Sequence, residues 1–139
     1  MKKRTILIAL TLLAATCTFA QSAKIKFQHT TYDFGVFVRD SAILTHNFVF
    51  TNTGDAPLII HQAVASCGCT VPEFTLAPIN PGEKGTVKVT YNGKRKRAGK
   101  FRKSISIVHN GKHSPVRLYV EGEMFDEEVD LQRSLKEKK

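Results

Sequence analysis

The chain has 139 residues, and its 21 lysines and arginines outnumber its 12 aspartates and glutamates, which gives a net charge of +9. This length is sufficient for one domain with a modest core. Only two of the three cysteines lie outside the first 20 residues, too few for a scaffold built on disulfides, so apolar burial must supply the stability.

The first 20 residues have the pattern of a secretory signal peptide. Basic residues at positions 2–4 precede an apolar run at 6–15, and residues 18–20 are Thr-Phe-Ala, which suits signal peptidase. We expect cleavage before Gln21, which leaves residues 21–139 with a net charge of +6 in a compartment that permits disulfides. The apolar run is shorter than the about 20 residues of a membrane-spanning helix. Lipidation at Cys17 is the alternative, although its sequence context is poor.

Short runs in which apolar and polar residues alternate recur through residues 21–122. A period of two with one apolar face is typical of half-buried antiparallel strands. The runs predict strands at 24–28, 44–51, 58–64, 74–76, 86–91, 101–107 and 116–121. Segment 58–64 is more continuously apolar than the others, which predicts a central strand.

Turn residues separate these runs, including Asn92-Gly93 and Asn110-Gly111, where glycine permits the positive φ of a tight hairpin. The pattern indicates an all-β domain over residues 21–122, an immunoglobulin-like two-sheet antiparallel β-sandwich of about seven strands. A small β-barrel is the alternative. Residues 123–139 are mostly charged, and we expect a solvated C-terminal tail, helical in part. Its acidic first half either rests against the basic domain or makes no fixed contact, and the second is favoured.

Several short motifs together resemble a known family. They are Tyr-Asp-Phe-Gly at 32–35, Phe-Thr-Asn-Thr-Gly at 50–54, Ser-Cys-Gly-Cys-Thr at 66–70, Pro-Gly-Glu at 81–83 and Gly-Lys-Phe at 99–101. In this order, over residues 27–122, the chain resembles domain-of-unknown-function family 1573, exported immunoglobulin-like proteins abundant in Bacteroidota. The resemblance implies export and a fold similar to the major-sperm-protein and PapD-like sandwiches that serve as binding modules. It implies no activity and no catalytic residues.

Cys67 and Cys69 flank a single glycine, and three interpretations stay open. In an extended strand their Cα atoms would be about 6.6 Å apart, near the upper limit for a disulfide, and Gly68 permits a closer approach. The first interpretation is an inert local disulfide, and the second is a pair of thiols with a redox role. The third is a soft-metal site, with Cu(I) between the two thiolates or zinc with added histidine. His61 and His109 are then the candidate histidine ligands. We expect no other cofactor.

Residues 92–103 concentrate positive charge in what the pattern predicts to be one hairpin. The basic residues are Lys94, Arg95, Lys96, Arg97, Lys100, Arg102 and Lys103. One interpretation is a solvated loop that resists aggregation. The other is a patch for an anionic partner, such as phospholipid head groups, lipopolysaccharide or acidic polysaccharide. No aromatic residues interleave to stack bases, so we do not expect a nucleic acid partner.

Enzyme signatures such as a nucleophile elbow, a phosphate-binding glycine loop or a zinc-protease motif are missing from the sequence. We therefore predict a non-enzymatic binding module of the cell envelope, periplasmic or secreted, whose partner is an envelope protein or an anionic glycan or lipid surface. An extended peptide can add a strand to an exposed sheet edge of such a fold. The alternative function is thiol-redox chemistry or copper handling through Cys67 and Cys69.

Overall fold

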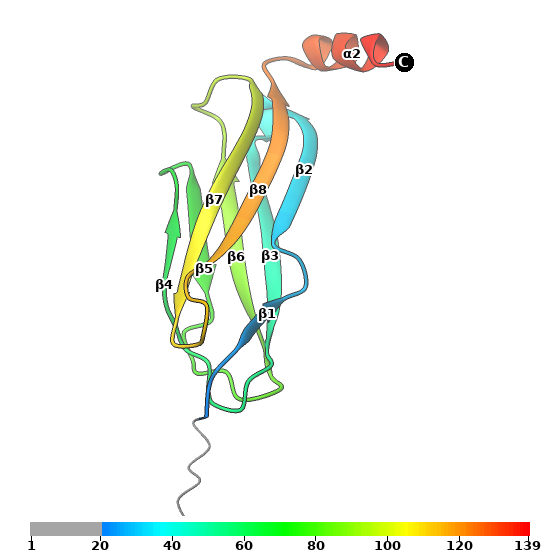
Figure 1. Ribbon diagram of the computed structural model, residues 1–139. Helices are drawn as coiled ribbons and strands as arrows, with labels where there is room; N and C mark the ends of the chain where they lie inside the picture. The colour runs from blue at the N-terminus through cyan, green and yellow to red at the C-terminus, as the bar shows by residue number, and fades with distance from the viewer. Residues whose placement is uncertain (1–20) are drawn as a thin grey trace, which may run out of the picture.

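A computed structural model describes residues 21–139, and the predicted signal peptide lies outside the described residues. Two four-stranded sheets pack face to face as a β-sandwich, and one helix follows at the C-terminus (Figure 1). The first sheet has the strand order β1-β3-β6-β5, and the second has the order β2-β8-β7-β4. The bounds are β1 Ile25–Phe27, β2 Thr31–Val38, β3 Ile43–Asn52, β4 Ile60–Ala65, β5 Thr70–Phe74, β6 Lys84–Asn92, β7 Gly99–His109, β8 Val116–Phe125 and α2 Glu128–Glu137.

The predicted immunoglobulin-like sandwich is confirmed, with eight strands in residues 21–139 instead of seven. The strand that the sequence pattern missed is β2, and it pairs in parallel with β8, so the second sheet is mixed and not purely antiparallel. A bulge between Asp33 and Val36 interrupts this pairing. The two sheets remain separate, so the alternative of a barrel is wrong.

Three further expectations about strands are wrong. The apolar segment 58–64 overlaps β4, which lies at the edge of its sheet and not at the centre. The strand expected at 74–76 occurs earlier, as β5. The basic segment is not a hairpin, because β6 and β7 belong to different sheets and residues 93–98 cross between them.

The core forms where the inward rows of both sheets meet. The central strands β3, β6, β7 and β8 each contribute alternate residues with 0% exposure: Phe48, Phe50, Val87, Val89, Ile105, Ile107, Leu118 and Val120. Full burial of each such side chain contributes about 1.5–3 kcal/mol. A second, smaller cluster joins Phe37, Ala42, Cys69, Tyr91 and Met124. Tyr91 stacks on Phe101 with ring centroids 4.1 Å apart.

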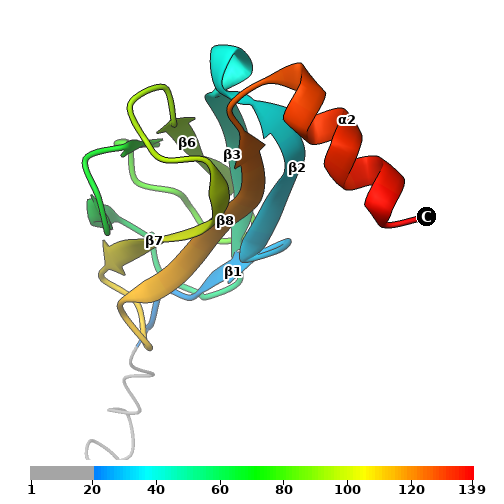
Figure 2. The same cartoon turned by 90° about the horizontal axis from the view of Figure 1, so that it is seen from above.

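The domain extends beyond the expected boundary at residue 122. Strand β8 continues to Phe125, and Met124 is buried in the smaller cluster. The expected tail then forms α2, which lies outside β2 and β8 (Figure 2). Leu131 is buried, and Lys138 Nζ lies 3.5 Å from Glu123 Oε2. The C-terminal segment therefore makes a fixed contact with the domain, contrary to the favoured expectation.

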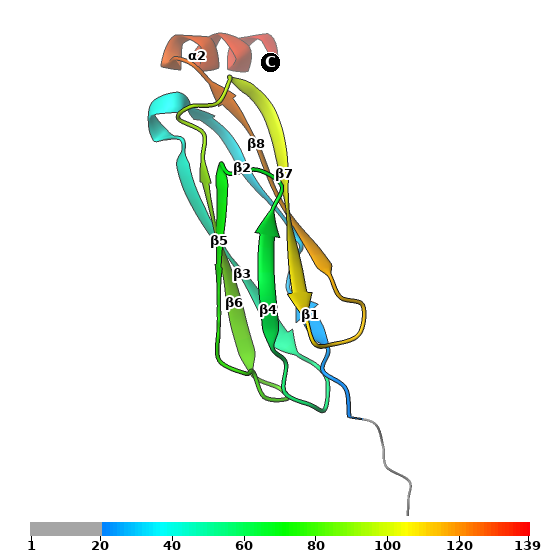
Figure 3. The ribbon, with the colours of Figure 1, turned by 90° about the vertical axis from the view of Figure 1, so that its left-hand side faces the viewer.

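The two ends of the sandwich differ in what they carry. Residue 21 enters at one end, whereas α2 and the β6–β7 connection lie at the opposite end (Figure 1). The β4–β5 connection, which contains both cysteines, also lies toward that far end. Figure 3 shows β4 at the margin of its sheet, beside β5 of the other sheet.

Candidate functional site

The free margin of β4 is an unpaired strand edge. Ser66 N donates to Ser104 O at 2.9 Å. In the β4–β7 register, residues 64 and 62 are equivalent to Ser66, so their backbone groups also point toward β7. Because ladder bonds alternate along an antiparallel pair, the N–H and C=O groups of Ala63 and Ala65 point away from β7. Within residues 21–139 these groups have no hydrogen-bond partner. The β4 margin can therefore accept main-chain hydrogen bonds from an additional strand.

The other sheet edges are less suited to pairing. In β5, Asn92 N donates to Cys69 O and Thr75 N to Thr86 O, so the backbone groups of the even-numbered residues face outward. Thr70 N already donates to Cys67 O, and Pro72 has no N–H to offer. Proline at an outward position is a known protection of edge strands.

Strands β1 and β2 also make poor templates. Strand β1 has only three residues. Strand β2 is interrupted by its bulge, and α2 packs against it. In contrast, β4 contains no proline and no lysine, arginine, aspartate or glutamate. Strand β4 has its own register shift between Ile60 and Gln62, but after it residues 62–65 pair regularly with β7 and include neither proline nor a charged residue. Of the four edges, this stretch is therefore the least protected.

The side chains along the β4 margin are small and uncharged. Ala63 and Ala65 face the core and are only partly buried, as is Phe74 on neighbouring β5. Val64 points to the opposite face and is 45% exposed. An incoming strand could thus place alternate side chains beside Ala63 and Ala65 without displacing a charged group of β4.

The Cys67–Gly68–Cys69 segment forms the turn by which the chain passes from β4 to β5. The two sulfur atoms are at bonding distance, and the Cα atoms are 5.3 Å apart. Cys69 is buried in the smaller core cluster, and Thr70 Oγ1 lies 3.7 Å from one sulfur and 3.9 Å from the other. This geometry fits the first interpretation, an inert local disulfide, and equally the oxidised form of the redox pair in the second.

The two candidate histidine ligands lie far from the cysteines. His109 ends β7, and His61 lies near the start of β4, whereas Cys67 follows the end of β4. Six residues of extended chain span about 20 Å. Among the described residues no three histidine, cysteine or acidic side chains gather as a metal-binding group. The structure therefore does not bring the four predicted metal ligands together.

His109 has a packing role in the turn before β8. Its side chain is 4% exposed, and Nδ1 accepts the N–H of Gly111 at 3.1 Å. Acceptance at Nδ1 requires the proton of a neutral ring to be on Nε2, and Nε2 is buried with no partner among the described residues. Burial, and to a lesser extent nearby His61, lowers the pKa of His109. The ring is thereby kept neutral.

The seven basic residues of segment 92–103 divide into three groups. The four at positions 94–97 lie on the exposed β6–β7 connection, which we call the basic loop (residues 93–98). Lys100 and Arg102 lie opposite Glu123 and Glu121 on β8, and Arg102 Nη1 bonds Glu121 Oε2 at 2.9 Å. The last, Lys103, is partly buried in the inward-facing row of β7. Of these seven, Arg102 alone takes part in an ion pair among the described residues, and the four loop residues form the group that lies on an exposed connection.

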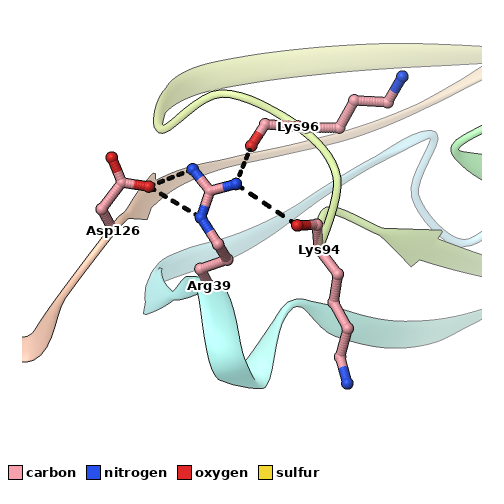
Figure 4. Close-up of polar contacts among 4 residues, drawn as sticks. All are labelled: Arg39, Lys94, Lys96 and Asp126. Carbon is pink, nitrogen blue, oxygen red and sulfur yellow. Dashed lines mark hydrogen bonds and ion pairs between the residues drawn. The ribbon is translucent and has the colours of Figure 1, made fainter.

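Arg39 connects the basic loop to the C-terminal segment. It lies in a short 3-10 turn after β2, and its Nη1 donates to Lys96 O at 2.7 Å and to Lys94 O at 3.4 Å (Figure 4). Its Nε donates to Asp126 Oδ1 at 2.8 Å, and Nη2 contacts the same oxygen. Local sequence patterns do not indicate this residue, because its partners are more than 50 positions away.

A pair of histidines was also missed. His29 Nε2 lies 2.8 Å from His46 Nε2, and the His46 ring stacks on Tyr32 with centroids 3.5 Å apart. Burial, with a smaller effect of His29, lowers the pKa of His46. The three rings pack against one another where the chain passes from β1 to β2.

Comparison with solved structures places the fold among known sandwiches. A protein of unknown function from Porphyromonas gingivalis W83 has 20% identity and a TM-score of 0.67, with 78% of this chain and 50% of that chain covered. The PapD-like domain 7 of human CEP192 has 11% identity and a TM-score of 0.61, with 77% and 89% covered. The CupB2 chaperone of Pseudomonas aeruginosa has 13% identity and a TM-score of 0.51, with 81% and 61% covered.

These similarities support the fold alone, since every identity is low, and the chain spans only half the length of the Porphyromonas protein. No curated protein matches the sequence significantly. In residues 21–139 no helix has the length and apolar character to cross a membrane. The model of the family described as proteins of unknown function, DUF1573, matches residues 25–124, which confirms the resemblance seen in the motifs, and the chain belongs to this family.

Proposed function

We propose that the protein is an exported, non-enzymatic binding module of the cell envelope that captures an extended segment of a partner protein along β4. The observation that carries this proposal is the unpaired margin of β4, with the outward backbone groups of Ala63 and Ala65. Main-chain bonds along such an edge provide affinity, and the side chains at alternate positions provide selectivity. Export is proposed from the composition of residues 1–20.

The comparisons agree with a protein partner. Three similar sandwiches are chaperones, and one of these is described as periplasmic. Chaperones act on other polypeptides, so the same sandwich serves protein binding elsewhere. Because a fold does not determine function, the argument for this chain rests on its own edge strand.

The test begins with a random twelve-residue peptide library displayed on phage and selected on the purified protein. A selected peptide is then synthesised with a methyl group on one backbone nitrogen at a time. We expect methylation at alternate positions to weaken binding about tenfold or more, because every second N–H donates to the strand it joins. Equal sensitivity at successive positions, or the recovery of no peptide, would contradict strand addition.

A variant of the protein gives an independent readout. Ala63→Pro reproduces on β4 the protection that Pro72 gives β5, since it removes an outward N–H and spares the bonds to β7. We expect loss of peptide binding, whereas Gln62→Thr, with its side chain on the solvent face of the same strand, keeps it. Circular dichroism and thermal unfolding verify that each variant is folded. Methylated peptides with the wild-type protein decide the question if Ala63→Pro fails to fold.

A further inference from the structure

A positively charged cavity lies close to the end of the β4 margin. It has a volume of about 410 Å³ and is lined by Gly68 and Cys69 of the disulfide turn, by Asn92 and by residues 94–96 of the basic loop. The lining includes the three cationic residues 94–96 and no acidic residue, and the side chains of Lys94 and Lys96 extend away from each other (Figure 4). Among the described residues, none of these three cations takes part in an ion pair. The cavity is therefore suited to an anionic group from outside the chain.

Arg39 keeps this positive charge available. It binds the carbonyl oxygens of Lys94 and Lys96, so these negative ends of the peptide dipoles are occupied by a guanidinium group. The acidic side chain that reaches this region, Asp126, pairs with Arg39 instead of with the loop (Figure 4). The basic loop thus has its backbone held in place while its own side-chain charges stay uncompensated.

One wall of the cavity follows shortly after the end of β4 in the sequence. Ala65 is the last residue of β4, and Gly68, which lines the cavity, comes three positions later. Three residues of an extended peptide cover about 10 Å, and a lysine side chain adds further reach. A peptide paired with Ala63 and Ala65 that continues past the end of β4 would therefore bring its next residues to the cations.

We infer that the partner segment carries acidic side chains, aspartate or glutamate, which bind in this cavity while the adjoining residues pair with β4. This inference rests on the proposed function and specifies the chemistry of the partner. Exposed ion pairs add modest affinity, but complementary charge raises the association rate and selects among partners. The contribution declines as salt increases, because exposed charges are screened.

A polyanionic glycan or lipid surface is a weaker match to the same charges. Such partners favour an extended positive surface, but the outward-facing cations beyond the loop, Lys100 and Arg102, lie opposite Glu123 and Glu121. The three cations that line this cavity all lie on one loop. A short acidic stretch on a peptide matches this size better than a long polyanion does.

The test compares two charge variants in the phage selection described above. The basic-loop variant carries Lys94→Gln, Arg95→Gln and Lys96→Gln. The control carries Lys26→Gln, Lys84→Gln and Lys112→Gln, three exposed lysines on β1, at the start of β6 and in the β7–β8 turn. Both variants lose the same net charge, so a difference between them reports on the position of the charge. Selected peptides are then measured by fluorescence anisotropy at low and at about 150 mM salt.

We expect peptides selected on the wild type to be enriched in aspartate and glutamate at one end. The basic-loop variant should bind them about tenfold more weakly, and the control should bind them as the wild type does. Peptides that show alternate sensitivity to methylation but no acidic preference would overturn this inference and leave the proposed function intact. Dextran sulfate, or vesicles of anionic phospholipid, bound more tightly than the acidic peptides and lost in the basic-loop variant would assign the cavity to a polyanion and also overturn it.

Discussion

Replacement of Asn52 by alanine should destabilise the domain strongly, because this side chain joins three segments in the core. Asn52 is fully buried at the end of β3. Its Nδ2 donates to Ala56 O at 2.7 Å and to Ile79 O at 2.9 Å. Its Oδ1 accepts the N–H of Gly54 at 3.0 Å and, more weakly, that of Lys24 at 3.4 Å. Asn52→Ala leaves these groups without this partner at a site that is buried at Ile79 O and partly buried at the other contacts.

The expected loss follows from these four contacts. Three well-formed hydrogen bonds at about 1 kcal/mol each give a decrease of about 3 kcal/mol in the free energy of unfolding. For a domain of this length the unfolding entropy is about 0.25 kcal/mol per kelvin, so the melting temperature should fall by about 12 °C. Urea unfolding followed by circular dichroism measures the first quantity, and calorimetry measures the second.

Asn110→Ala is the matched control. Asn110 accepts the N–H of Ile59 at 2.9 Å and donates to Pro57 O at 3.0 Å, but its side chain is exposed. Water can replace both bonds, so we expect a loss of at most about 1 kcal/mol. Equal losses in the two variants would show that burial of the Asn52 contacts does not determine their contribution, and the reasoning would be wrong.

Three other variants test separate parts of the structure. The double variant Cys67→Ala, Cys69→Ala should lose about 1.6 kcal/mol in the free energy of unfolding, since the disulfide closes a loop of only three residues. We expect the loss in the double variant to be no larger than the loss that reduction causes in the wild type. Arg39→Ala should speed amide hydrogen exchange in residues 93–98, measured by mass spectrometry, with unchanged exchange in β3 as the internal control. His109 has a lowered pKa in the folded state, so its contribution to stability is complete above the unfolded value of about 6.5 and is lost as pH falls through the folded pKa. His109→Asn, which keeps an acceptor for the Gly111 N–H, should flatten the decline in stability as the pH falls below about 6.5.

The fold class was predictable because most strands bury one face and expose the other. Strand β2 was not predicted because its bulge changes the phase of the pattern. Tyr32 and Phe34 are partly buried before the bulge, but after it the buried residue is Phe37 and Val36 is exposed. A period of two that changes phase within eight residues does not appear as alternation.

The position of β4 could not be predicted from its composition. Leu58 and Ile60 are buried, so the segment reads as apolar, but Val64 is exposed and no strand lies beyond β4 in the described residues. Hydrophobicity reports burial by the facing sheet and by loops as well as by neighbouring strands. The edge, and with it the proposed binding margin, follows only from the pairing of strands that are distant in sequence.

The distribution of charge in the basic segment, residues 92–103, could not be predicted from local sequence either. Seven cations within ten positions look like one surface, but the alternation of β7 turns Lys103 toward the core, and the pairing with β8 compensates Arg102. The disulfide turn and the basic loop form a common cavity although more than 20 residues separate them. Such proximity depends on the crossovers between sheets, which local patterns do not encode.

The parallel pairing of β2 with β8 has a mechanical consequence. The described chain begins at one end of the sandwich and finishes at the other, and β2 lies alongside the last strand, β8, in two paired stretches, Thr31↔Tyr119 to Asp33↔Glu121 and Val36↔Glu123 to Val38↔Phe125. A pulling force applied between the two ends therefore acts along these strands and loads their hydrogen bonds together in shear, instead of opening them one after another. A module held at its N-terminus while α2 is pulled would resist extension until this whole ladder yields.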